Sequence, residues 1–348
     1  RFTFHGFRYV EVTGYPGTPP LDAITGVVAG SDTPYVGTFE CSNPQLNQLQ
    51  HNIQWGQRGN FLEAPTDCPQ RDERLGWMGD AQVFVRAACV NADSAAFFVK
   101  WLQDVRDAQT KDGAFTDVSP DLLGGHGVAG WADAGIIVPI TLYEVTGDRR
   151  FLTDNYDAMS RYIAFMGSHS TDLIRPAEGF GDWLSIGAET PKDVIATAFF
   201  AWMASEMERV ATLLGKPDDA KGFADLAMRV REAFNKAFVA PDGRITGDTQ
   251  TDYVLALHMD LLPESLRRAA AKYLADDIEK RGDHLSTGFL GTAYVMEVLT
   301  RFGYTDLAYR LLLQDTMPSW LFSVKNGATT LRERWDGWTP EKGFQDPG

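Results

Sequence analysis

The segment 67–80 holds the residues whose types point most clearly to chemistry. It reads Asp-Cys-Pro-Gln-Arg-Asp-Glu-Arg-Leu-Gly-Trp-Met-Gly-Asp, with four carboxylates and two arginines, and its apolar residues follow neither the helical nor the strand period. Charge runs usually face water, so a solvated loop is the alternative interpretation. The proline, the two glycines and the tryptophan favour a held loop that presents carboxylates to a ligand.

Three further segments repeat this mixture of glycine, acid and tryptophan: 130–133 (Gly-Trp-Ala-Asp), 181–184 (Gly-Asp-Trp-Leu) and 329–337 (Thr-Thr-Leu-Arg-Glu-Arg-Trp-Asp-Gly). Together with residues 67–80, and in this order, they resemble the signature of the bacterial α-L-rhamnosidases. The likeness covers most of the chain, and a match of this length is far more specific than a short glycine motif. It implies an inverting glycosidase whose catalytic domain is an (α/α)6 toroid of six helical hairpins.

Inverting hydrolysis needs two carboxyl groups, one to protonate the leaving oxygen and one to deprotonate a water. The resemblance implies that Glu73 is the general acid, although a glutamate that merely pairs with an arginine is the alternative. Neighbouring carboxylates would raise the pKa of Glu73 and the two arginines would lower it, so the net shift depends on geometry. The resemblance implies Glu333 as the general base, whereas composition alone does not prefer it to Asp336 or Glu341.

Sugar binding should combine charged groups against hydroxyls with aromatic rings against the apolar face and methyl group of a 6-deoxy sugar. A tryptophan taken alone is more often a packing residue than a ligand contact, and Asp133 and Asp182 could equally cap helices. With the resemblance counted, the expected substrate-binding residues are Asp67, Arg71, Trp77, Asp80, Trp131, Asp133, Asp182, Trp183 and Trp335.

Helices must position these residues. From residue 44 to residue 324 the chain shows an almost unbroken series of amphipathic helical patterns, roughly a dozen with short links. The pattern predicts a mainly α fold, with an antiparallel helical toroid as the simplest arrangement. Loops on a rigid scaffold often carry function, and connections are usually short. The four recognised segments lie in longer insertions, at 60–78, 112–131, 171–189 and 326–348.

Composition excludes several classes of function. A net charge of -15 argues against nucleic acid, whose phosphates need a basic surface, and suits a neutral ligand such as a sugar. The three cysteines show no Cys-x-x-Cys spacing and the six histidines no His-Glu-x-x-His pattern. We therefore expect no metal, no cofactor and no structural disulfide. No stretch reaches the roughly 18 apolar residues of a membrane span, so no membrane partner is expected.

The two ends of the chain differ from the helical body. Residues 1–30 alternate aromatic and β-branched residues and then turn residues, which predicts the terminal strands and linker of a preceding β-sandwich domain. Residues 31–348 then form the toroid domain. The resemblance implies a histidine segment shortly after residue 348 in relatives, so we expect the toroid to be truncated at its C-terminal end. Arg332 also departs from the family, which commonly has an aromatic residue there.

The leading hypothesis is an exo-acting α-L-rhamnosidase that removes terminal rhamnose from glycosides, oligosaccharides or polysaccharides. A six-hairpin glycosidase for another sugar, such as α-L-fucose, is the second, because pocket shape decides a single hydroxyl configuration. A non-catalytic carbohydrate-binding protein is the third, but such a protein has no need of both Glu73 and Glu333. A polysaccharide lyase would need a Tyr or His base beside basic partners, and the insertions hold no such cluster. The sequence predicts no particular oligomeric state or location.

Overall fold

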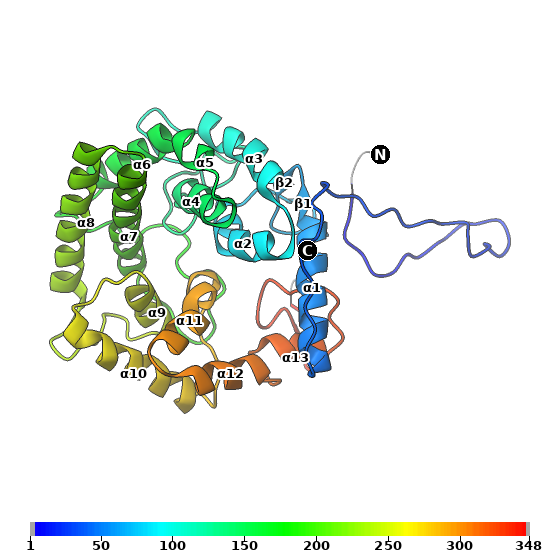
Figure 1. Cartoon of the computed structure of the whole chain (residues 1–348). Coiled ribbons are helices and arrows are strands. Elements are labelled where there is room, and N and C mark those ends of the chain that lie inside the picture. The colour runs from blue at the N-terminus through cyan, green and yellow to red at the C-terminus, as the bar shows by residue number, and fades with distance from the viewer. Residues whose placement is uncertain (1–3, 346–348) are drawn as a thin grey trace.

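The computed structural model describes residues 4–345, which fold mainly as a ring of helices (Figure 1). The elements, in chain order, are α1 (Pro44–Asn60), β1 (Phe61–Leu62), β2 (Ala64–Pro65), α2 (Met78–Asn91), α3 (Ala95–Asp107), α4 (Ala134–Thr146), α5 (Arg150–Thr153), α6 (Tyr156–Ser168), α7 (Lys192–Leu213), α8 (Pro217–Phe238), α9 (Gln250–His258), α10 (Glu264–Lys280), α11 (Phe289–Arg301), α12 (Thr305–Leu313), α13 (Trp320–Lys325), β3 (Trp338–Thr339) and β4 (Gly343–Phe344).

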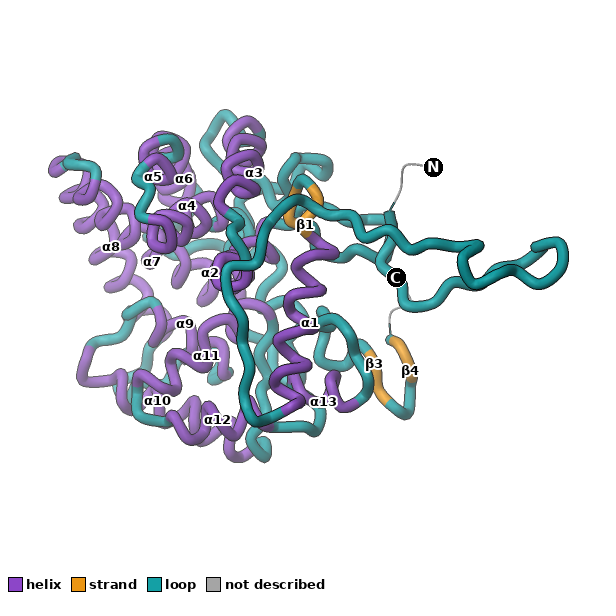
Figure 2. Tube along the Cα trace, turned by 45° about the vertical axis from the view of Figure 1, so that its right-hand side comes forward, coloured by secondary structure: helices purple, strands orange, loops and turns teal. Residues whose placement is uncertain are grey.

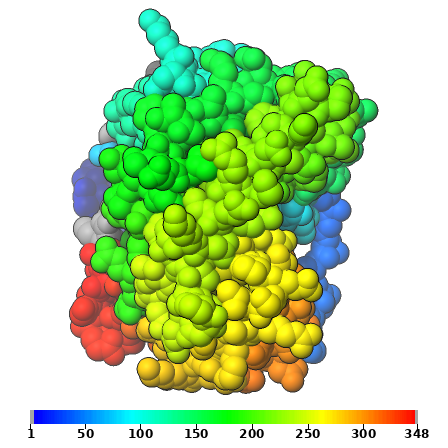
Figure 3. All heavy atoms as spheres, turned by 90° about the vertical axis from the view of Figure 1, so that its left-hand side faces the viewer, coloured from blue at the N-terminus to red at the C-terminus, as the bar shows by residue number. Residues whose placement is uncertain are grey.

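The helices form two concentric layers. In the inner layer α2, α4, α7, α9 and α11 pack against one another in turn, and α11 returns to α2. Helices α3, α6, α8, α10 and α12 lie outside them, and α13 packs against α1 to close the ring (Figure 1). Figure 3 shows the outside of this ring, where α6, α8 and α10 form a continuous convex wall. The predicted helical toroid is confirmed.

Sequence pattern explains which helices lie inside. Every residue of α4 from Ala134 to Leu142 is buried, as expected of a helix that is apolar on all sides. Outer helix α8 instead buries a single stripe, in which Val230, Phe234 and Phe238 recur every four residues. Full burial of one such phenylalanine contributes roughly 1.5–3 kcal/mol. Among residues 4–345, no helix combines the length and the apolar character needed to cross a membrane.

The N-terminal segment departs from expectation. Residues 4–30 form no strand, and they extend from the ring as a long loop (Figure 2). Phe7 and Tyr9 are 63% and 85% exposed, because no neighbouring strand in the structure offers a pairing edge or a surface that would cover them. Residues 1–3 of the predicted strands lie outside the described residues. The strands that do form are two short antiparallel pairs, β1 with β2 and β3 with β4.

Candidate active site

The loops that precede the inner helices α2, α4, α7 and α11 meet the segment after α13 at one end of the ring, here called the loop end. It comprises residues 60–78, 112–131, 171–189, 281–288 and 326–345. Side chains join these loops: the indole nitrogen of Trp335 donates a hydrogen bond to the carbonyl of Thr287 at 2.8 Å, and Trp77 contacts Phe180 with ring centroids 5.6 Å apart. Helix N-termini carry partial positive charge, which favours carboxylates at this end.

Asp67 organises the loop that carries Glu73. Its Oδ1 accepts a hydrogen bond from the backbone N–H of Leu75 at 2.9 Å, and its own N–H donates to the carbonyl of Leu75 at 3.1 Å. Its Oδ2 pairs with Arg71 at 2.8 Å. Arg74 adopts a positive φ of 46° and turns the chain back toward Asp67. Burial raises the pKa of Asp67, opposed by a hydrogen bond with the Cys68 thiol and then by the charge of Arg71. The result is a closed loop with Glu73 at its exposed side.

Glu73 accepts hydrogen bonds on both carboxylate oxygens. Arg71 donates to Oε2, and the indole nitrogen of Trp77 donates to Oε1 at 2.8 Å. Partial burial raises the pKa of Glu73, but these two hydrogen bonds and the charge of Arg71 outweigh it, so the pKa lies below its ordinary value. Neighbouring carboxylates alone would raise the pKa of Glu73. The net effect is a lower pKa, because Arg71 lies directly against Glu73.

Four carboxylates, Asp67, Glu73, Asp80 and Glu333, form what we call the carboxylate cluster. Asp80 lies in the first turn of α2, where burial raises its pKa well above the ordinary value and the negative charges of the other three add to the rise. The Sγ atom of Cys68 lies 3.6 Å from Oε2 of Glu333, which is 265 positions later in the chain. Within residues 4–345, no group of three or more His, Cys, Asp or Glu side chains is arranged to hold a metal ion.

Three of the predicted tryptophans surround one phenylalanine. The ring of Phe180 lies 5.6 Å from that of Trp77, 4.9 Å from Trp131 and 6.2 Å from Trp183, measured between centroids. Trp183 is 42% exposed and Trp77 is partly buried, whereas Trp131 is only 3% exposed. A Cβ atom on Gly79 would lie 2.5 Å from the Trp131 ring, so the start of α2 accepts only glycine beneath it. Trp77 and Trp183 therefore offer ring surface to a ligand, and Trp131 supports them.

Sequence reasoning missed Phe180. A signal was present, since this aromatic residue stands between Gly179 and Gly181, both with positive φ (88° and 70°), and two positions before Asp182. Glycines with positive φ mark a tight turn that other residues rarely adopt. A turn of this kind places the phenylalanine ring among the three tryptophans.

Asp182 holds two inner helices in place. Its Oδ2 accepts from the N–H of Gly288 at 2.7 Å and from the hydroxyl of Thr251, and its Oδ1 accepts from the N–H groups of Leu290 at 2.8 Å and Gly291 at 3.2 Å. Burial raises its pKa, opposed by these hydrogen bonds. The carboxylate is 6% exposed and caps the N-terminus of α11 from a distant loop.

Asp133 is also a buried carboxylate beneath the site. It is 0% exposed, its Oδ2 accepts from the N–H of Gly130 at 2.7 Å, and burial raises its pKa to about 6. Trp335 is partly buried and packs edge-on against Trp320, with centroids 5.6 Å apart. The structure thus brings nine of the eleven predicted site residues to the loop end, and places Asp80 and Asp133 at the start of the helices α2 and α4 that follow its loops. It buries Trp131, Asp133 and Asp182 below the surface that a ligand would reach.

The N-terminal residues 4–8 brace the site from outside. The guanidinium of Arg74 donates a hydrogen bond to the carbonyl of Phe4 and lies 4.8 Å from the centre of its ring. Arg8 donates to the carbonyl of Gly327 at 3.0 Å. The same short stretch therefore contacts both the loop of Glu73 and the segment that carries Glu333.

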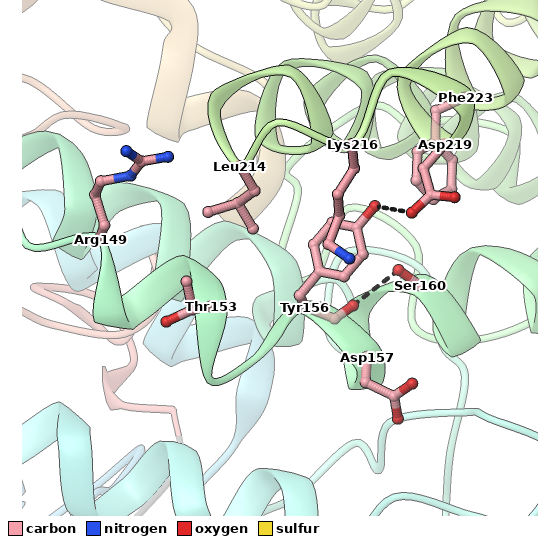
Figure 4. A pocket seen from close by; sticks show the side chains of 9 residues that line it. All are labelled: Arg149, Thr153, Tyr156, Asp157, Ser160, Leu214, Lys216, Asp219 and Phe223. Atoms are coloured by element: carbon pink, nitrogen blue, oxygen red, sulfur yellow. Dashed lines mark hydrogen bonds between the residues drawn. The ribbon is translucent and has the colours of Figure 1, made fainter.

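A large cleft lies away from the carboxylate cluster. It has a volume of about 650 Å³ and opens between α5, α6 and the start of α8 (Figure 4). Three of its polar side chains contact one another: Tyr156 donates to Asp219 at 2.8 Å, and the Lys216 ammonium lies 4.6 Å from the Tyr156 ring centre. None of the predicted site residues lines it, so cavity size does not locate the chemistry of this domain.

The ring of helical hairpins with acidic loops at one end is the architecture of a six-hairpin domain. Residues 34–347 match the family model of the bacterial α-L-rhamnosidase six-hairpin glycosidase domain. The chain belongs to this family.

Individual relatives agree with this family. An α-L-rhamnosidase of Streptomyces avermitilis is 55% identical over 348 residues, which is 100% of this chain and 34% of that protein. An α-L-rhamnosidase of Formosa agariphila is 43% identical over 99% of this chain and 38% of its own length. A crystal structure of the Streptomyces enzyme complexed with L-rhamnose matches with a TM-score of 0.96 at 54% identity, over 99% of this chain and 33% of that chain. The native Aspergillus terreus enzyme gives a TM-score of 0.94 at 34% identity, over 99% and 42%. The chain spans about a third of the length of its relatives.

Proposed function

We propose that this domain hydrolyses terminal, non-reducing α-L-rhamnose from glycosides, oligosaccharides or polysaccharides. The observation that carries the proposal is the carboxylate cluster, in which Glu73 and Glu333 come together from segments far apart in sequence. Membership of the rhamnosidase family and the likeness to an enzyme complexed with L-rhamnose support the choice of sugar.

In this proposal Glu73 protonates the leaving oxygen and Glu333 deprotonates a water on the opposite side of the anomeric carbon, which inverts its configuration. A general acid needs its proton, whereas Arg71 and Trp77 lower the pKa of Glu73 in the free protein. A glycoside bound against Glu73 excludes water from the carboxyl group, and its hydroxyls compete for Arg71. Both changes raise the pKa of Glu73 toward the range that acid catalysis requires.

The remaining residues divide into those that bind the sugar and those that position others. Arg71, Asp67 and Asp80 bind hydroxyl groups, and burial together with the nearby carboxylates raises the pKa of Asp80. Trp77 and Trp183 cover the apolar face of the ring. The residues that we assign to positioning are Trp131, Asp133, Asp182 and Trp335.

The test is release of nitrophenol from p-nitrophenyl α-L-rhamnopyranoside, compared with a panel that includes the α-L-fucopyranoside. We expect turnover of the rhamnoside alone, with β-L-rhamnose as the first product by NMR. Glu333→Gln should lower kcat about 10²–10⁴-fold, and Glu73→Gln should lower it less, because nitrophenol leaves with little help from an acid. Turnover of another glycoside would overturn the substrate. Binding of rhamnose without turnover of any glycoside would indicate a carbohydrate-binding domain instead.

A further inference from the structure

One buried side chain of the loop end has no part in the roles assigned so far. Cys68 follows Asp67 directly and is 4% exposed. Its Sγ atom lies 3.6 Å from Oε2 of Glu333, within the range of a hydrogen bond to sulfur. This contact joins the loop that carries Glu73 to the segment that carries Glu333. The other oxygen of the Glu333 carboxylate, Oε1, makes no such contact with the thiol.

The surroundings of Cys68 keep its proton in place. Burial raises the pKa of the thiol, and the nearby negative charges of Asp67 and Glu333 raise it further, whereas Arg71 acts in the opposite direction. A thiolate here would face two carboxylates. The neutral S–H group is therefore the form that lies between Asp67 and Glu333. Toward an ionised carboxylate a thiol acts as the donor.

We propose that Cys68 is a positioning residue for the general base: its S–H group donates a hydrogen bond to Oε2 of Glu333 and leaves Oε1 free to accept the proton of the attacking water. The inference rests on the proposed function, since it assigns Glu333 the role of base. It adds a residue, Cys68, that acts on the reaction only through another side chain.

A neutral and weak donor suits this position. A lysine or arginine at residue 68 would form a charged pair with Glu333 and reduce its tendency to take a proton. An alanine would leave the carboxylate of Glu333 free to rotate. The thiol fixes the orientation of the Glu333 carboxylate and reduces its negative charge less than a lysine or arginine would.

The first test compares the kinetics of Cys68→Ala and Cys68→Ser with those of Cys89→Ala. Cys89 is a matched control, since it is a buried cysteine of α2 outside the carboxylate cluster. In Cys68→Ala we expect kcat on the rhamnoside to fall about tenfold with little change in KM, and the acidic limb of the kcat profile to move to higher pH. Cys68→Ser should restore most of kcat. Equal losses in both variants, or wild-type kinetics in Cys68→Ala, would overturn the proposal.

The second test does not depend on activity. The rate of alkylation of Cys68 by iodoacetamide, followed by mass spectrometry of its peptide as pH is varied, reports ionisation of the thiol. In Glu333→Gln the repulsive charge is removed, so alkylation should begin at lower pH, with no change at Cys89. An unchanged profile for Cys68 would exclude the contact with Glu333. If the unmodified protein hydrolyses the rhamnoside but the alkylation profile of Cys68 is unchanged in Glu333→Gln, the proposed function stands and the role of Cys68 is refuted. If the unmodified protein is inactive but the profile shifts, the contact stands and the proposed function is refuted.

Discussion

Carboxylates are arranged differently at the two ends of the inner helices. At the end away from the loops, Glu144 pairs with Arg86 at 2.6 Å and with Arg209 at 2.9 Å, and Arg209 also pairs with Glu206 at 2.6 Å. This ion-pair network, from the C-terminal halves of α2, α4 and α7, balances each carboxylate with a guanidinium. At the loop end, Arg71 pairs with two carboxylates of the carboxylate cluster, Asp67 and Glu73.

The ion-pair network stabilises the ring, whereas the carboxylate cluster holds the groups that could act on a ligand. The pKa of Asp80 is raised mainly by burial and then by its acidic neighbours Asp67, Glu333 and Glu73. Grouping carboxylates in this way costs stability, and such sites are typical of catalysis. The scaffold tolerates the cost because buried residues such as Asp182 hold the loops to the helices.

The largest expected contrast is between carboxylates of the two ends. Glu73→Gln should lower kcat about 10²–10⁴-fold on an alkyl rhamnoside and much less on the nitrophenyl rhamnoside, whose leaving group needs little help from an acid. Glu333→Gln should lower both rates alike. Glu144→Gln, at the ion-pair network, should leave kcat unchanged. Steady-state kinetics on the two substrates would measure this, and an equal loss on both in Glu73→Gln would contradict its role as acid.

A second contrast concerns stability at the loop end. Asp182→Ala should lower the free energy of unfolding by roughly 3 kcal/mol, because several buried N–H groups lose their acceptor. Asp182→Asn keeps one acceptor oxygen and should lose less. Chemical denaturation measures both variants. If Asp182→Ala keeps its stability and instead loses affinity for rhamnose, Asp182 contacts the sugar and is not a positioning residue.

A third effect is a shift in pH dependence. Trp77→Phe removes the indole hydrogen bond that helps to lower the pKa of Glu73 and keeps the ring contact with Phe180. The pKa of Glu73 should rise, so the acid keeps its proton to higher pH and the alkaline limb of kcat/KM moves upward. A pH profile of kcat/KM measures the shift, with Trp183→Phe as a control that lacks this hydrogen bond. A limb that moves downward or not at all would refute the assignment.

The smallest effect is expected within the ion-pair network. Arg209→Met removes contacts to Glu144 and Glu206 and should cost under about 1 kcal/mol, because the Arg209 side chain is 38% exposed and solvent screens the pair. Activity on the rhamnoside should not change. Thermal unfolding at low and high salt would show the loss shrinking as salt rises. A loss of several kcal/mol would mean that this end also carries buried, unbalanced charge.

Much of this protein could be predicted from local features. The 3.6-residue period of helices such as α8 and the unbroken apolar run of α4 indicate the two layers of the ring. The segments around Glu73, Trp131, Trp183 and Glu333 stand out because acids, glycines and tryptophans interrupt that period. These signals are local, since residue type and spacing alone produce them.

Only the tertiary structure decided how those residues act on one another. Glu73 has a lowered pKa because the Arg71 guanidinium is directed at it, and Asp182 caps α11 from more than a hundred residues away. The contact between Cys68 and Glu333 likewise joins residues 265 positions apart. Aromatic alternation in residues 1–30 predicted strands, yet a strand requires a partner that the described structure does not provide. Such features depend on distances between segments that are far apart in the chain, and these arise only when the ring closes.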